Sequence, residues 1–107
     1  MDTKEIQRQV DKWISQFAEG YWEPLTSLAV LTEEVGELAR EINHKFGQKP
    51  KKSSEPESSL SLELGDIIFV LAAFANAHNL DLGEAFAQAM AKNWSRDKER
   101  WTLKESK

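Results

Sequence analysis

Two groups of carboxylates interrupt the most apolar parts of this chain at helical spacing. Glu33, Glu34 and Glu37 fall within five residues, and Glu63 with Asp66 opens a second apolar segment. Carboxylates at i and i+3 lie on one side of an α-helix, so each pair can act as a unit. Carboxylate-only ligation favours hard cations such as Mg²⁺, which often shares its oxygen ligands with substrate phosphates. The spacing predicts two facing helices that hold a divalent cation.

A solvated acidic face is the competing interpretation of these acids. Glu is a good helix former, and acids at this spacing are common on helix surfaces. That interpretation accounts well for Glu33, Glu34 and Glu37, but poorly for Glu63 and Asp66, whose side of the helix becomes apolar one turn later. An ionised carboxylate that enters a buried face needs a partner or a metal. Glu63 and Asp66 are therefore the stronger evidence for a metal site.

Four helices are needed to position these acids, and hydrophobic periodicity predicts them. Their expected ranges are about 3–19, 24–46, 59–78 and 81–94. Gly20 is expected to end the first helix and Pro24 to open the second. The third helix is apolar all round from Ile67 to Ala75 and should be the buried central helix. The fold class is therefore all-α, a four-helix bundle in a single domain over 1–107.

The segment 47–59 differs in composition from the expected helices. It has no large apolar residue but contains two Pro, three Lys and four Ser. Such a composition predicts a flexible linker. Lys49, Lys51 and Lys52 could lean over an anionic substrate, although a solvated hinge is the simpler explanation.

Groups that could bind a nucleotide lie elsewhere in the chain, which has no P-loop and no glycine-rich cradle. Lys92 and Arg96 share a helix face, with Asn93 beside them, and could hold phosphate groups. Trp22 and its neighbour Tyr21 could stack a base or only fill the space between two helices. Acids for Mg²⁺, cations for phosphate and aromatic rings for a base together predict metal-assisted attack of water on a phosphoryl group.

Composition excludes several other classes of protein. The chain has 107 residues and no Cys, so neither disulfides nor Cys-based zinc sites contribute. A net charge of −4 argues against nucleic-acid binding. The N-terminus lacks a signal-peptide core, and the longest apolar run, 67–75, is far shorter than the roughly 20 residues that span a bilayer. We expect a cytoplasmic protein with no membrane or nucleic-acid partner, and a domain this small often oligomerises.

The order of the acids resembles a known signature. Glu33-Glu34-x-x-Glu37, 25 further residues and then Glu63-x-x-Asp66 is similar to the EExxE…ExxD pattern of the MazG-like nucleotide pyrophosphohydrolases. This all-α superfamily also includes dimeric dUTPases and phosphoribosyl-ATP pyrophosphohydrolases. The resemblance implies a helical bundle completed as a homodimer or homotetramer. It also implies dependence on Mg²⁺, with Mn²⁺ able to replace it, and cleavage of an NTP or dNTP to NMP and pyrophosphate, in a house-cleaning role.

The resemblance also implies roles for individual residues. The implied metal ligands are Glu34, Glu37, Glu63 and Asp66. Glu33 matches an acid that orients or activates water, and Glu37 is counted with it as catalytic. Lys92, Asn93 and Arg96 match substrate contacts, to which our own reasoning adds Trp22. The connection that contains Trp22 lacks the His of the deoxycytidine-preferring branch, so base preference stays open.

Two alternatives remain at this point. The first is a phosphoribosyl-ATP or dUTP pyrophosphohydrolase of the same superfamily. The second is a non-catalytic helical oligomerisation module whose acids are solvated.

Overall fold

The computed structural model of the chain describes residues 1–48, 52 and 59–105, and within these ranges it contains helices and no strand. The elements, in order, are α1 (Thr3–Ile14), α2 (Pro24–Phe46), α3 (Leu60–Ala77), α4 (Leu82–Arg96) and a 3₁₀ turn, η1 (Lys98–Arg100). The all-α prediction is confirmed, and α2 has the expected bounds. Most of the predicted linker, at 49–51 and 53–58, lies outside the described residues.

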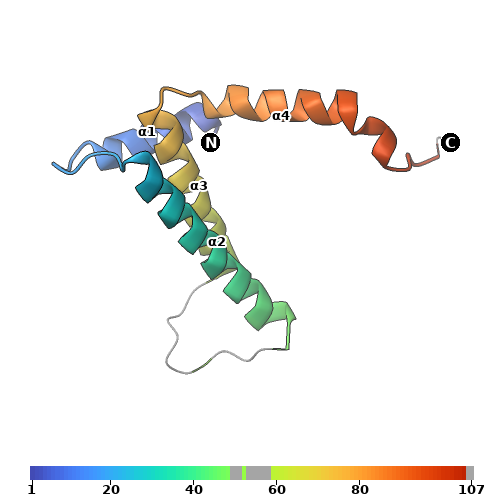
Figure 1. Cartoon of the computed structure of the whole chain (residues 1–107), viewed down its shortest axis with the longest axis horizontal. Coiled ribbons are helices and arrows are strands. Elements are labelled where there is room, and N and C mark those ends of the chain that lie inside the picture. The colour runs from blue at the N-terminus through green and yellow to red at the C-terminus, as the bar shows by residue number, and fades with distance from the viewer. Residues whose placement is uncertain (49–51, 53–58, 106–107) are drawn as a thin grey trace.

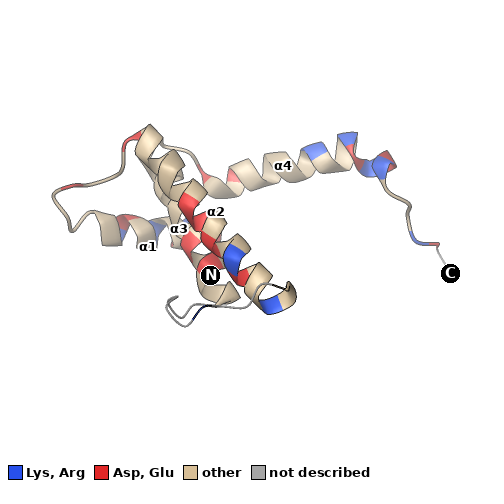
Figure 2. Cartoon of the chain, turned by 60° about the horizontal axis from the view of Figure 1, so that its bottom comes forward, with Lys and Arg blue, Asp and Glu red and all other residues tan. Residues whose placement is uncertain are grey.

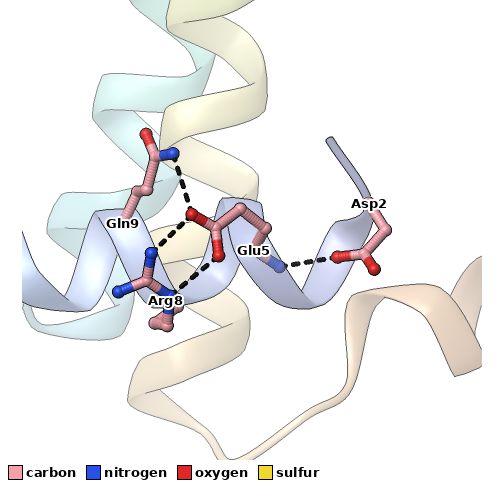
Figure 3. Close-up of polar contacts among 4 residues, drawn as sticks. All are labelled: Asp2, Glu5, Arg8 and Gln9. Carbon is pink, nitrogen blue, oxygen red and sulfur yellow. Dashed lines mark hydrogen bonds and ion pairs between the residues drawn. The ribbon is translucent and has the colours of Figure 1, made fainter.

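Side-chain caps explain where three of the helices begin. Each capping oxygen accepts a hydrogen bond from a backbone N–H three residues later: Asp2 from Glu5, Ser59 from Leu62, and Asp81 from Glu84. Pro24 opens α2 without a side-chain cap. On α1, Figure 3 shows Arg8 and Gln9 donating to the Glu5 carboxylate. These hydrogen bonds, that from Arg8 first, lower the pKa of Glu5 to about 2.

The first helix is shorter than its periodicity predicts. It ends at Ile14 rather than near Glu19, and tight turns follow, with the Phe17 N–H donating to the Ile14 carbonyl and the Gly20 N–H to the Phe17 carbonyl. The Phe17 ring packs edge-on against Trp13 at 5.0 Å between centroids, so it remains near the helix without extending it. Gly20 adopts a φ of +66°, which suits glycine, within the connection to α2.

The core lies where α3 packs against α2 and α1. Figure 1 shows α2 and α3 side by side and antiparallel, with α1 across their upper end. The buried apolar side chains are Ile14, Val70, Ala72, Ala73 and Ala75. Because four of these five belong to α3, it is the central helix, as predicted. It is not buried all round, however, because Ile68, Leu71 and Phe74 are 45%, 41% and 39% exposed.

The apolar stripe of α2 does not face this core. Leu28, Val35 and Ile42, which recur along this stripe at seven-residue spacing, are 58%, 50% and 44% exposed. The buried residues of α2 are instead polar, namely Ser27 and Glu41. Within one chain, α2 therefore uses its acidic side to contact α3 and leaves its most apolar side outside.

A polar joint connects α1, α3 and the start of α4. The Gln7 side-chain amide donates to Asn76 Oδ1 at 2.8 Å and to the Leu80 carbonyl at 3.0 Å. Its oxygen accepts from the Leu82 N–H at 2.8 Å, and Asn76 Nδ2 donates to the Gln7 carbonyl at 2.9 Å. One amide thus sets the direction in which α4 leaves the rest of the fold.

Gln7→Leu should lower the free energy of unfolding by about 2 kcal/mol, because it leaves partly buried groups of Asn76 on α3 and Leu82 on α4 without their partner. Urea unfolding followed by circular dichroism measures this change. Gln9→Leu, on the same helix, removes an exposed hydrogen bond to Glu5 and should change the free energy of unfolding by less than about 0.5 kcal/mol. Equal losses in the two variants would show that the joint does not stabilise the fold.

Helix α4 is the only one of the four α-helices in the described residues that has no buried residue. Figure 1 shows it running away from the α2–α3 pair, and none of its residues is buried. Phe86, Met90 and Trp94 recur along it at four-residue spacing and are 66%, 38% and 68% exposed. The four predicted helices are present, but α4 does not close a bundle within this chain.

By length and composition alone, α3 could cross a membrane. It has 18 residues and a mean hydropathy of 1.6. The core helix of a soluble protein passes the same test, and α3 packs against two other helices here. This helix is therefore weak evidence for a membrane span.

Candidate active site

The two acid pairs meet between α2 and α3. Glu34 and Glu37 from α2 and Glu63 and Asp66 from α3 each offer a carboxylate oxygen, and these oxygens all lie within 4.8 Å of one another. Figure 2 shows acidic residues along both helices where they run side by side. Glu63 is 4% exposed and the other three are half-buried. The antiparallel pair thus brings together the four residues that the sequence suggested as metal ligands.

Electrostatics make this cluster costly without a cation. Burial raises the pKa of Glu34, and the neighbouring carboxylates of Glu37, Asp66, Glu63 and Glu33 raise it further. Glu34 Oε2 is buried and, within the described part of the chain, accepts no hydrogen bond. Carboxylate oxygens in a half-buried cluster are the ligands that Mg²⁺ or Mn²⁺ prefers, so the residues fit a hard divalent cation.

The helix positions distinguish the members of the cluster. Glu63 lies in the first turn of α3, a common position for acidic residues because of the helix dipole. Glu33 is exposed and is not among the four acids whose oxygens converge. It nevertheless lies close enough to raise the pKa of Glu34. Glu33 is therefore at the edge of the cluster.

An aromatic hollow begins one helical turn from the acids. Trp22 stacks on Phe69, with 6.3 Å between ring centroids and 27° between planes, and Phe69 follows Asp66 by three residues. The cavity has a volume of about 230 Å³ and is lined by Trp13, Ile14, Phe17, Glu19, Gly20, Trp22 and Phe69. Trp22 is 39% exposed. Phe69 could not be identified from the sequence, because one aromatic residue in an apolar helix has no feature that distinguishes it from a core residue.

Tyr21 has a different place from its neighbour Trp22. Its hydroxyl donates to Asp11 Oδ1 at 2.6 Å, which ties the connection to α1. Burial, followed by the hydrogen bond to Asp11, raises the pKa of the Tyr21 phenol. Tyr21 therefore has a structural partner within the chain.

The suggested phosphate contacts are not near the acids within one chain. Lys92, Asn93 and Arg96 are exposed in the last turns of α4, which leads away from α2 and α3 (Figure 1). Their suggested role would require α4 to approach the acids of another copy of the chain.

Arg40 and Glu41 were not among the residues that sequence reasoning selected. Glu41 is 7% exposed, and Arg40 is half-buried one turn beyond Glu37. The spacing of Arg40 did indicate a possible role, because a cation three residues after a candidate metal ligand lies on the same side of the helix.

Carboxylates that converge from two antiparallel helices of an all-α fold define a candidate site for a divalent cation. The family model of the MazG nucleotide pyrophosphohydrolase domain matches residues 23–101, which include both acid pairs and all of α4. The chain therefore belongs to the MazG family and is a hydrolase of this kind. Its family is thus one of enzymes and not of non-catalytic oligomerisation modules.

Individual relatives agree with this assignment. YpjD of Bacillus subtilis (strain 168) is 53% identical over 102 residues, covering 95% of this chain and 92% of that protein. The crystal structure of YpjD from Bacillus subtilis superposes with a TM-score of 0.77 at 50% identity, covering 86% of this chain and 94% of that one. The crystal structure of a Bacillus-conserved MazG protein, a nucleotide pyrophosphohydrolase, has a TM-score of 0.77 at 44% identity. The match covers 92% of this chain and 96% of that one.

Proposed function

We propose that this protein is a Mg²⁺-dependent nucleoside triphosphate pyrophosphohydrolase of the cytoplasm. It cleaves an NTP or dNTP between the α and β phosphates, giving NMP and pyrophosphate, and removes unwanted nucleotides. Mn²⁺ can replace Mg²⁺. The observation that carries this proposal is the convergence of four carboxylate oxygens within 4.8 Å in a chain of the MazG family.

The proposed roles of the carboxylates differ with their positions in the cluster. Glu34, Glu37, Glu63 and Asp66 hold the cation, which when bound supplies positive charge to polarise phosphoryl oxygens. Glu33, exposed at the edge of the cluster, orients the attacking water and accepts its proton. As the new oxygen–phosphorus bond forms, the bond to the bridging oxygen breaks and pyrophosphate leaves. Glu37, one turn after Glu33 on the same side of α2, would hold the cation and help Glu33 to orient the water.

The aromatic hollow is the proposed place for the nucleobase. Trp22 already stacks on Phe69 and keeps part of its ring exposed. A base that stacks in this hollow would lie about one helical turn from the acids, which hold the phosphates. Stacking tolerates every base, so this contact leaves the base preference open.

A second copy of the chain is proposed to cover the exposed apolar surface, giving a homodimer or homotetramer. The outward side of α2 and α3 contains an almost wholly apolar cavity of about 440 Å³, lined by Pro24, Ser27, Leu28, Leu31, Val70, Leu71 and Phe74. An apolar surface across two helices, with a fourth helix that has no buried residue, is typical of a protein–protein interface. Association would also allow α4 of one copy to bring Lys92, Asn93 and Arg96 to the acids of the other.

Pyrophosphate release from a panel of canonical and modified NTPs and dNTPs tests the proposed activity. We expect release with Mg²⁺ and none after chelation of the metal. Including dUTP and phosphoribosyl-ATP separates the two related activities, because exclusive cleavage of either would replace the general assignment. If no compound releases pyrophosphate, and Mg²⁺ does not raise the melting temperature, the proposal is wrong.

A further inference from the structure

Arg40 is a cation one turn from Glu37, and the described part of the chain gives it no partner. It is half-buried on α2, and its buried Nε donates no hydrogen bond to any described residue. Among the described residues its guanidinium forms no ion pair, although Glu37 precedes it by one turn and Glu41 is adjacent. Nearby acids therefore do not satisfy this side chain.

A half-buried guanidinium whose N–H groups have no acceptor is suited to binding an anion. A guanidinium carries five N–H donors in a planar fork and has no acceptor. A buried donor without a partner costs free energy, which a phosphate oxygen can recover through a charge-assisted hydrogen bond. The fork matches phosphate geometry, since two parallel N–H groups can donate to two oxygens of one phosphate group.

Helix geometry places Arg40 at one end of the acids and the aromatic hollow at the other. Arg40 lies one turn past Glu37 toward the C-terminus of α2, and Phe69 lies one turn past Asp66 toward the C-terminus of α3, each about 4.5 Å along its axis. Because the helices are antiparallel, these two displacements point in opposite directions (Figures 1 and 2). Viewed down the axis of α2, Arg40 and Glu33 each lie within about 60° of Glu37. All three residues are therefore on the side of α2 away from its apolar stripe.

We propose that Arg40 binds the phosphates that leave as pyrophosphate. This inference rests on the proposed function and adds an orientation for the substrate. The base lies toward Trp22 and Phe69, the scissile phosphate at the four acids, and the terminal phosphates at Arg40. The guanidinium then offsets the negative charge that grows on the leaving group. It also reduces the repulsion between the carboxylates and the phosphates of the substrate.

Arg40→Gln tests this proposal, with Arg8→Gln as the matched control on the exposed face of α1. We expect kcat/KM for the best substrate of the panel to fall by about 100-fold. Inhibition by added pyrophosphate should weaken by at least about 10-fold. The rise in melting temperature with Mg²⁺ alone should stay as in the wild type, because Arg40 holds no metal. The Arg8 variant should match the wild type in all three measurements.

The outcomes separate this inference from the proposed function. An inactive wild-type protein would overturn the function and, with it, the role of Arg40. An active wild type, with an Arg40→Gln variant within about twofold of it in both kcat/KM and pyrophosphate inhibition, would overturn only the role of Arg40. If the Gln variant has less helix than the wild type, Arg40→Met, which keeps the aliphatic stem, is measured in its place by the same criteria.

Discussion

Glu37→Gln and Asp66→Asn should each reduce pyrophosphate release by at least about 100-fold without loss of helical content. Each change removes one charge from the four proposed ligands, whose oxygens lie within 4.8 Å of one another, while preserving the shape of the side chain. The melting temperature without metal should not fall, because removing one negative charge relieves repulsion among the carboxylates. With Mg²⁺, the rise in melting temperature expected for the wild type should be absent in both variants.

Glu84→Gln is the matched control for these two variants, because Glu84 is exposed in the first turn of α4 and far from the cluster in sequence. It should keep the wild-type rate and the wild-type response to Mg²⁺. If Glu37→Gln or Asp66→Asn retained near wild-type turnover, the assignment of metal ligands would be wrong.

Two variants that are inactive alone should recover activity when mixed. Glu37→Gln removes a metal ligand, and Lys92→Ala combined with Arg96→Ala removes the cations of α4. If α4 of one copy serves the acids of the other, each mixed dimer carries one site with both sets intact. Random pairing makes half of the dimers mixed, so we expect about one quarter of the wild-type rate after the two chains are unfolded and refolded together.

The same mixture distinguishes a shared site from a site within one chain. If Lys92 and Arg96 serve the acids of their own chain, every site in the mixture is defective and the rate stays at background. A doubly defective chain, with Glu37→Gln and both α4 changes, is the control partner. Mixed with either variant, it should restore nothing, because no pairing then provides an intact site.

The sequence was sufficient to predict the helices and the convergence of the acids. The bounds of α2 follow from Pro24 at its start and from an uninterrupted helical pattern up to Gly47. The meeting of Glu34 and Glu37 with Glu63 and Asp66 follows from i, i+3 spacing on two antiparallel helices. Both depend on local geometry, which a sequence determines directly.

The side of α2 that faces α3 could not be predicted in the same way. Hydrophobic periodicity identifies the stripe that avoids water but does not say whether the same chain or another covers it. Leu28 and Val35 are on that stripe and point outward in a single chain. The early end of α1 at Ile14 was missed for a related reason, since Phe17 continues the apolar spacing while packing on Trp13 from a turn.

The polar seam between α2 and α3 bears on how this protein reaches its native state. Ser27, Glu41 and Glu63 occupy buried positions there, and they supply little hydrophobic free energy compared with the leucines outside. A chain whose strongest apolar surface faces outward gains much of its stability only when that surface is covered. Folding and assembly would then be a single equilibrium, and stability would rise with the concentration of the protein itself.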